Sequence, residues 1–401
     1  MVFKRIIKLV LRFVLLLVIL AASYVAFNYL TCPIYDFPEP EPFSGEFIYN
    51  PYQQVDSFNW RRANFQIQSY AWWGITGGRN NTNEAIDSVY RRLGYEIIAT
   101  SDYMRINEYG KDKPEYIPVY EHGYGIRKQH QVVIGASGVS WRDYPLFQTL
   151  HHKQHIIDLL QKKNEMVYIA HPRLRYGWDP EDFLYLTNYD GIEVLNYMRF
   201  SPEHWDAALS AGRYATVLGN DDAHDLTQQL EVGHRCTYVH AEKLEKNEIL
   251  SSMRKGIHYA ADIFRTAQET WDEKVSKVPE IASIRWVKVT GDTLRVECSK
   301  EALEFRFIGQ GGKIMKTAKT GTGAKYIIRE DDTYIRTEIT FPDKNIFYLN
   351  PVVRYDGTAP GIMEKAEVNL ARSLTFWIIS WSVVLVIVYL IIRRRRRKRN
   401  K

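Results

Sequence analysis

Carboxylate and imidazole side chains stand at the ends of several predicted strands in this 401-residue chain. Glu121 follows the apolar run IPVY, His130 precedes QVVIG, and His171 follows MVYIA. Asp222 and His224 come shortly after ATVLG. These side-chain types suit Zn²⁺, Mn²⁺ or Fe²⁺. If they converge, we expect them to hold a divalent cation, which would acidify water and polarise a phosphoryl oxygen.

Further polar side chains occupy equivalent positions in the predicted strands. They are Gln66, Gln68, Asp102, Arg173 and Glu193. Parallel α/β proteins collect their functional groups at the carboxyl ends of strands, so we expect these residues to contact the substrate. The arginine among them could steady a phosphate group through paired N–H donors.

Each of these residues, taken singly, also has a structural explanation. His171 precedes a proline and could close a strand, Asp222 could cap a helix, and Glu121 could pair with Arg127. Arg173 could form a surface salt bridge. The functional interpretation therefore depends on how many such residues stand at equivalent strand ends.

Alternating strands and helices must position these side chains. Apolar runs predict the strands, and apolar residues at helical spacing predict helices that include 147–162 and 202–211. Asn81 is expected to cap a further helix with Glu84 as its partner. The predicted strands are 64–68, 96–100, 117–120, 131–135, 166–170, 192–195, 214–218 and 236–240. The alternation predicts a largely parallel sheet, open or closed into a barrel, over residues 59–275.

The pattern of the sequence changes from about residue 280. Short segments of alternating apolar and polar residues, separated by Gly, Asp and Lys turns, replace the helices. This pattern is typical of antiparallel sheets. We therefore expect a small antiparallel β-sandwich over residues 280–362.

Two apolar runs near the chain ends predict transmembrane helices. Residues 13–30, within a segment 1–32, and residues 373–392 contain no charged side chain. At about 1.5 Å per residue, each run covers roughly the 30 Å hydrocarbon core of a bilayer. A cleaved signal peptide is the alternative for the first run, but no small-residue cleavage site follows it.

Basic residues flank the outer end of each span. Four precede the first span and eight lie in the tail 393–401, so without these twelve charges the net charge of +6 becomes −6. The positive-inside rule places both termini in the cytoplasm and the main domains outside the cytoplasmic membrane. Residues 33–58, rich in Pro, Glu and aromatic side chains, are predicted to be a linker. The acidic central part gives no support to nucleic-acid binding.

The order of the motifs resembles that of the PHP (polymerase and histidinol phosphatase) superfamily. NFQIQSYAWWG, IIATSDY, IPVYE, HQVVIG, YIAHP, IEVLN and LGNDDAH follow one another between residue 60 and about residue 262. The resemblance implies a distorted (β/α)7 barrel that binds up to three metals and hydrolyses phosphate esters. The predicted β-sandwich is similar to the one on some exported members.

The chain departs from the family pattern at three places. Gln66 and Gln68 replace a His-x-His pair, Trp73 replaces an acidic or histidine ligand, and Asp102-Tyr103 replaces an Asp-His pair. Glutamine amides are poor ligands for Zn²⁺ or Mn²⁺, and tryptophan cannot coordinate a metal. The family pattern therefore leaves ligands for one metal position, so the expected cofactor is one divalent ion or none.

Three hypotheses of different classes follow. The first is a metal-dependent phosphoesterase for a small phosphorylated substrate, with the cation held by Glu121, His130 and His171. In this hypothesis Asp222 and His224 orient or deprotonate water. The second is a catalytically inactive PHP-like fold that binds a polar ligand or docks a partner. The third is a purely structural envelope protein, which needs neither metal nor pocket.

Overall fold

The computed structural model describes residues 2–55, 59–75, 78, 80–197, 199–358, 360 and 364–399. The remaining residues include short pieces of the predicted linker, barrel, β-sandwich and basic tail. Those pieces of the predictions lie outside the described residues.

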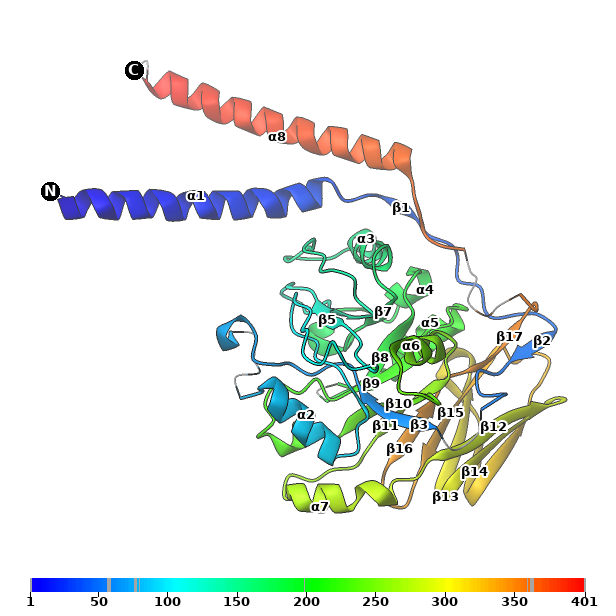
Figure 1. Cartoon of the computed structure of the whole chain (residues 1–401). Helices are drawn as coiled ribbons and strands as arrows, with labels where there is room; N and C mark the ends of the chain where they lie inside the picture. Colours follow the sequence, from blue (N-terminus) through cyan, green and yellow to red (C-terminus); the bar gives the residue numbers. More distant parts are fainter. Residues whose placement is uncertain are drawn as a thin grey trace.

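Two long helices extend from the folded part side by side, with both chain ends pointing the same way (Figure 1). They are α1 (Val2–Leu30) and α8 (Leu370–Arg399). Both are long and apolar enough to cross a membrane, as predicted. Each helix is longer than its apolar run because the flanking basic residues continue it. The Phe27 and Trp381 rings meet at 6.4 Å between centroids, and Trp377 Nε1 donates to the Cys32 carbonyl at 3.0 Å.

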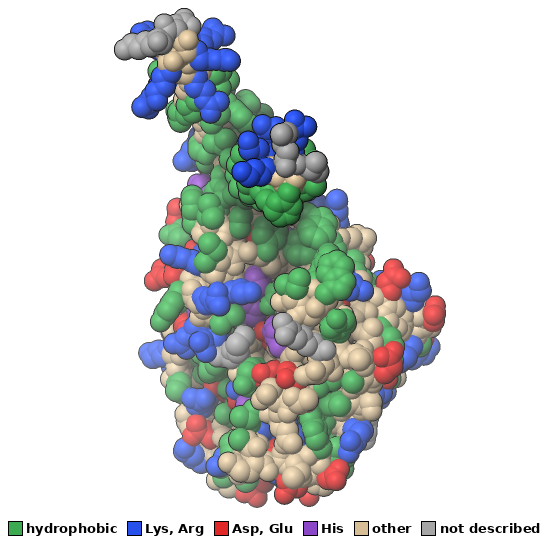
Figure 2. All heavy atoms as spheres, turned by 90° about the vertical axis from the view of Figure 1, so that its left-hand side faces the viewer, with side chains coloured by type: hydrophobic (Ala, Val, Ile, Leu, Met, Phe, Trp, Pro, Cys, Tyr) green, Lys and Arg blue, Asp and Glu red, His purple; other side chains and the backbone are tan. Residues whose placement is uncertain are grey.

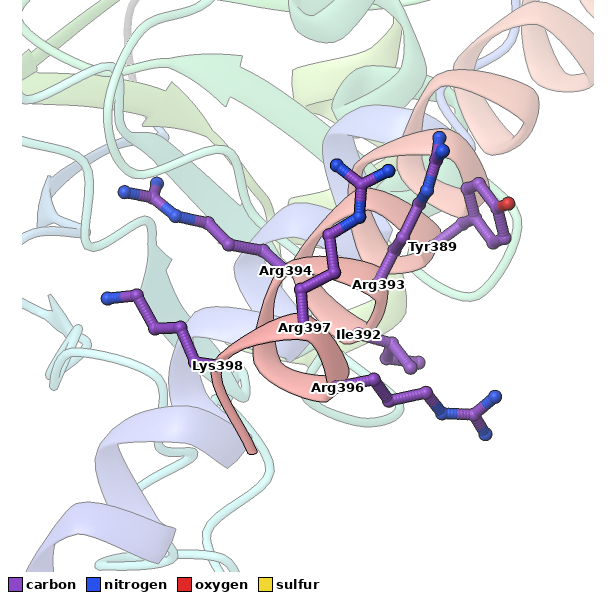
Figure 3. Close-up of a pocket in the computed structure, with 7 residues that line it drawn as sticks. All are labelled: Tyr389, Ile392, Arg393, Arg394, Arg396, Arg397 and Lys398. Atoms are coloured by element: carbon purple, nitrogen blue, oxygen red, sulfur yellow. The ribbon is translucent and has the colours of Figure 1, made fainter. Parts of the chain in front are cut away.

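The basic residues at the end of α8 surround a hollow beside that helix (Figure 3). Its lining residues are Tyr389, Ile392, Arg393, Arg394, Arg396, Arg397 and Lys398. All of them belong to α8, and their side chains point in several directions from the helix. A single helix cannot enclose a ligand, so this hollow is not a candidate binding site.

The first of two main sheets contains Glu121 and Glu193, and His130 and His171 flank its strands. Its strands, in spatial order, are β5 (Val119–His122), β6 (Gln131–Ile134), β7 (Met166–Ile169), β8 (Gly191–Asn196) and β9 (Thr216–Asn220). The last three run parallel, whereas β6 is antiparallel to both of its neighbours. The prediction of a largely parallel sheet is therefore correct for β7, β8 and β9, and it is wrong for the pairings of β6 with β5 and β7.

The second main sheet has eleven strands and runs through both predicted domains. Its main path is β12-β13-β15-β16-β11-β10-β3-β4, and of the strands described here only β3 and β4 pair in parallel. The strands are β2 (Phe47–Tyr49), β3 (Trp60–Asn64), β4 (Ile97–Ile98), β10 (Arg235–His240), β11 (His258–Asp262), β12 (Ile284–Thr290), β13 (Thr293–Gly309), β14 (Lys313–Ile327), β15 (Tyr334–Thr340), β16 (Ile346–Leu349) and β17 (Val352–Tyr355).

β11 belongs to the predicted α/β part and β16 to the predicted β-sandwich, and these two strands pair with each other. The predicted β-sandwich is thus not an isolated pair of sheets, because its strands continue the sheet of the α/β part. Alternating polarity indicates which face of a strand is buried, but not which strand lies at its edge. Neither main sheet closes on itself among the described residues.

Two isolated bridges link the main sheets next to the predicted site. Tyr103 bridges Glu121, and Ile67 bridges Ala223, both in parallel orientation. A separate two-stranded sheet, β1 (Tyr35–Asp36) with β18 (Glu367–Val368), ties together the segments that lead to the two long helices.

In the part of the chain that the structure describes, six shorter helices cover the sheets. They are α2 (Asn83–Arg92), α3 (Leu150–Gln161), α4 (Asp182–Tyr185), α5 (Pro202–Ser210), α6 (Lys246–Arg254) and α7 (Trp271–Ser276). The cap of α2 is Thr82, whose hydroxyl accepts from Ala85 N at 3.2 Å, so the prediction of Asn81 as the cap is wrong by one residue. Asn81 instead joins two loops, because its amide donates to Gln68 O and accepts from Leu226 N.

Candidate metal centre

Three adjacent strands bring Glu121, His130 and His171 together. Glu121 lies in β5, His130 directly precedes β6, and His171 follows β7. In an antiparallel hairpin the end of one strand neighbours the start of the next, so all three side chains reach the same edge of the sheet. One possible ligand atom from each lies within 4.8 Å of the others, and all three residues are buried.

The Glu121 carboxylate is the centre of this group. Its Oε1 contacts His130 Nδ1 and lies 3.2 Å from His171 Nε2. Its Oε2 accepts from Gln68 Nε2 at 2.7 Å, and Gln68 Nε2 also donates to Ser101 O at 3.0 Å. The two imidazoles must carry protons on the facing nitrogens to donate to Oε1. A divalent cation could take the place of those protons.

Burial and charge act against each other at these three residues. Burial alone would raise the pKa of Glu121, but the His130 and His171 imidazoles hold it below its ordinary value. Burial lowers the pKa of His130. His171 is equally buried, yet the Glu121 carboxylate raises its pKa to about 9. A lowered pKa favours the neutral form of the His130 ring, which is the form in which imidazole binds a metal.

Two more buried carboxyl groups face His171. Glu193 Oε2 accepts from His171 N at 2.9 Å, and its Oε1 accepts from Asn220 Nδ2 at 2.8 Å. Asp222 Oδ2 accepts from Asn196 Nδ2 at 3.2 Å. Burial raises the pKa of Glu193 to about 8 and the pKa of Asp222 to about 6. A cation beside these carboxyl groups would offset the cost of keeping them ionised.

The donor set therefore fits a divalent metal. One carboxylate and two imidazoles are a usual combination for Zn²⁺, and three protein ligands leave a position open. Several buried polar atoms here have no hydrogen-bond partner among the described residues: His130 Nε2, His171 Nδ1, Asp222 Oδ1 and both polar atoms of the Gln66 side chain. Each such atom costs about 1–3 kcal/mol, so a bound ligand or ion would stabilise this region.

Two residues of the candidate site have strained backbone conformations. His171 has φ +27° and Asp222 has φ +49°. Left-handed conformations at non-glycine residues cost roughly 1–3 kcal/mol and gather at functional sites. Here they turn the chain immediately after β7 and shortly after β9, at the edge where the candidate ligands meet.

His224 lies beside this group with one side partly exposed. Its Nδ1 lies 2.8 Å from the Asp222 carbonyl oxygen, which can only accept, so Nδ1 carries the proton of that hydrogen bond. Nε2 is then the ring atom that can take up or release a proton. Burial opposes the charged ring, but the Asp222 carboxylate raises the pKa of His224 above its ordinary value.

The other predicted contact residues have different surroundings. Asp102 accepts from Ser69 N at 2.8 Å and from Asn107 Nδ2 at 3.4 Å, so its carboxylate orders two neighbouring loops. Arg173 pairs with Glu203 at 3.2 Å and is half exposed. Gln68, in contrast, contacts Glu121 directly. Gln68 therefore belongs to the candidate centre. Asp102 and Arg173 instead contact residues that are not among the candidate ligands.

A largely apolar pocket of about 660 Å³, here called the aromatic pocket, opens beside the centre. Trp72, Ile75, Tyr103, Met104, Trp141 and His224 are among its lining residues. Trp141 and Tyr103 are not among the site residues predicted from the sequence. Trp141 lies in an irregular segment without a motif, whereas the position of Tyr103 after Asp102, at a strand end, could have indicated it.

Tyr103 is close to the candidate ligands. Its ring meets the His130 ring edge-on at 5.4 Å and the His224 ring at 6.3 Å. Burial, together with the Glu121 and Asp222 carboxylates, holds the pKa of Tyr103 well above its ordinary value. Its hydroxyl is therefore a proton-bearing group at neutral pH.

One solved structure is similar to this chain. It is a two-domain protein from Bacteroides vulgatus that contains a predicted PHP-like metal-dependent phosphoesterase. The two chains are 16% identical, the match covers 77% of this chain and 100% of the other, and the TM-score is 0.40. No family model matches this chain, and neither does any curated protein.

Proposed function

We propose that this chain is a membrane-anchored, PHP-like phosphoesterase with a single metal site. The observation that carries the proposal is the buried convergence of Glu121, His130 and His171 on one point. We also propose that β3 to β9 form the distorted seven-stranded barrel of that superfamily. The isolated bridges at Tyr103 and Ile67 support this proposal, since they lie where the two main sheets would meet.

The proposed reaction is the hydrolysis of a phosphate ester. A divalent cation held by Glu121, His130 and His171 would act as a Lewis acid on a phosphoryl oxygen and acidify a nearby water. His224 would exchange a proton through Nε2, because its Nδ1 is engaged by the Asp222 carbonyl. The Asp222 carbonyl keeps that ring oriented, and the Asp222 carboxylate raises the pKa of the ring.

The proposal of a single metal follows from the contacts of Glu121. Oε1 faces both imidazoles, while Oε2 is occupied by the Gln68 amide. A neutral N–H donor at 2.7 Å occupies one lone-pair direction of Oε2 and makes this oxygen less available to a second cation. Gln68 thus positions the carboxylate instead of binding metal.

Substitution of Gln68 by leucine tests this positioning role. We expect metal affinity to fall by about 10- to 100-fold, the usual effect of removing a hydrogen bond that orients a ligand. The three ligands themselves remain, so saturating metal should restore much of the activity. Titration with Mn²⁺ and Zn²⁺, read by activity and by bound metal, measures both effects. An unchanged metal affinity would contradict the role.

The principal experiment uses the full chain in detergent or nanodiscs. Bound metal is measured by elemental analysis, and phosphomonoesters and phosphodiesters are assayed with and without added Mn²⁺, Zn²⁺ or Fe²⁺. We expect about one metal per chain and metal-dependent phosphate release. Bound metal without hydrolysis of any ester would overturn the enzymatic proposal.

An inactive binding module is the second candidate function. The buried Gln66 amide, without a hydrogen-bond partner among the described residues, favours it, because such a group is suited to a polar ligand. In that case the chain would bind phosphate or another oxyanion without turnover.

We further propose that both termini are cytoplasmic and that the main domains lie outside the cytoplasmic membrane. The concentration of basic residues at the outer ends of α1 and α8 supports this orientation. Protease treatment of intact spheroplasts should then digest the folded part and spare the two terminal tails.

A further inference from the structure

The aromatic pocket has an unusual degree of apolar exposure at its mouth. Ile75 is 78% exposed and Trp141 is 55% exposed, and the neighbouring Trp73 is 83% exposed. Trp72 and Trp73 both have left-handed backbones, at φ +48° and φ +54°, and Trp73 projects outward. Large exposed apolar side chains that lie together mark contact with a membrane, a ligand or a partner.

The wall of this pocket is attached to a helix that could cross the membrane. Tyr24 Oη, in α1, donates to the Trp141 carbonyl at 2.9 Å. Five residues further along α1, Tyr29 Oη donates to the Phe147 carbonyl at 2.9 Å. Phe147 is itself 54% exposed. The apolar mouth therefore lies beside the end of α1, where an anchored chain meets the bilayer surface.

Figure 2 views the molecule from the side toward which both long helices project. Hydrophobic side chains gather below the helices on this face, and histidine atoms are visible in a hollow among them. Among the described residues His224 is a histidine of the pocket lining, with a side chain that is 31% exposed. If the helices are anchored in a bilayer, the opening of the pocket faces that bilayer.

One cationic residue lines the pocket, and a second lies near Tyr103. Lys128 lines it and places its Nζ 5.2 Å from the centre of the Tyr103 ring. The guanidinium of Arg175 is close enough to lower the cost of ionising Tyr103, and this residue is exposed. The pocket thus offers positive charge near the candidate metal centre and apolar surface toward the membrane.

We infer that the substrate is an amphiphilic phosphate ester taken from the bilayer itself. Its phosphate group would bind at the metal centre near Lys128 and Tyr103, and its hydrocarbon chain would lie against Ile75 and Trp141. This inference rests on the proposed function. In the reaction, water adds to phosphorus and the bond from phosphorus to the ester oxygen breaks. The departing oxygen takes a proton, giving inorganic phosphate and an alcohol that remains in the bilayer.

The first test compares n-alkyl phosphates from ethyl to decyl, with the metal-loaded full chain in nanodiscs. Each methylene that enters an apolar site is worth about fourfold in equilibrium. We expect kcat/KM to rise severalfold with each pair of added methylenes, and phosphatidic acid in the nanodisc to be hydrolysed. Equal kcat/KM values for all chain lengths would overturn the inference. Hydrolysis of the soluble esters without hydrolysis of phosphatidic acid would also overturn it.

Variants of two pocket residues test whether the dependence of kcat/KM on chain length arises in the aromatic pocket. Ile75→Ser and Trp141→Ser should lower kcat/KM for decyl phosphate and phosphatidic acid by more than tenfold and should lower kcat/KM for ethyl phosphate far less. Ile327→Ser is the control, since Ile327 is 58% exposed at the far end of the chain's β14 strand. A loss of decyl phosphate activity in the control as large as in the pocket variants would contradict the assignment.

A binding measurement separates this inference from the proposed function. Alkylphosphonates from ethyl to decyl cannot be hydrolysed, and their affinity is measured through their effect on the thermal unfolding of the full chain. If affinity rises with chain length but no ester is hydrolysed, the enzymatic proposal fails and the amphiphile site stands. If esters are hydrolysed without any dependence on chain length, the enzyme stands and the amphiphile site fails.

Discussion

Replacement of His171 by asparagine is expected to abolish stable metal binding and to lower phosphate release by more than about 100-fold, beyond the effect of removing a supporting hydrogen bond. The variant removes one of three ligands and leaves two, which cannot retain a divalent cation well. Asparagine suits this test because His171 has φ +27°, and asparagine tolerates left-handed backbone better than most residues. Bound metal and turnover are the two measurements.

His151→Asn is the matched control for this prediction. His151 lies in α3 (Leu150–Gln161), and its Nδ1 accepts from Tyr35 N at 3.1 Å, away from the candidate centre. We expect the control to keep its metal and its activity. The prediction fails if His171→Asn retains stoichiometric metal, or if the two variants lose activity equally.

Disruption of the Asp206–Arg336 pair is expected to produce the largest loss of stability. Asp206, in α5, accepts from Arg336 Nε and Nη2, both at 2.7 Å, and from the Tyr334 hydroxyl at 3.1 Å. Only 3% of the Arg336 side chain and 12% of the Asp206 side chain are exposed. Removal of one partner from a buried ion pair costs about 3–5 kcal/mol when the other partner is left unpaired, and the remaining contact of Arg336 with Glu338 places this pair at the lower end of that range.

Asp206→Ala should therefore lower the free energy of unfolding by that amount, as measured by denaturant or thermal unfolding of the full chain. The exposed pair of Lys319 and Glu304 is the comparison, because 73% of the Lys319 side chain is accessible. Lys319→Ala should cost no more than about 1 kcal/mol. Similar losses in the two variants would show that the Asp206 pair does not stabilise the contact between α5 and β15.

The Asp206–Arg336 pair connects the two predicted domains. It links a helix of the α/β part to a strand beyond residue 280, and the β11–β16 pairing links the same two parts through the backbone. Separate folding of residues 59–275 is therefore not expected. The predicted domain boundaries mark positions where the sequence pattern changes. As boundaries between folding units they stay a prediction.

Three histidines of α3 illustrate how burial depends on tertiary structure. His151 and His155 have the i,i+4 spacing of metal ligands, but no nearby acidic residue supports a metal site, so the sequence predicts a solvated helix face for these histidines. The solvated part of that expectation is wrong, because His152 and His155 are both only 8% exposed. His155 Nδ1 contacts the Tyr144 hydroxyl at 2.6 Å, and burial lowers the pKa of both rings.

The sequence alone determined the chemistry available at the candidate centre. Glu121, His130 and His171 each follow or precede a short apolar run, and such runs predict strands because only backbone pairing satisfies a buried chain. The apolar stretches within α1 and α8 were equally clear, since their length and lack of charge are local properties. Local patterns also gave most of the strands within a few residues.

Only the tertiary structure decided which groups meet. Strand order placed Gln68 on the second oxygen of Glu121, turned Asp102 toward Ser69, and brought Trp141 to the wall of a pocket beside α1. These contacts join residues up to 117 positions apart. Such pairings depend on the edges of sheets and on the packing of loops, and no local pattern of side chains encodes either.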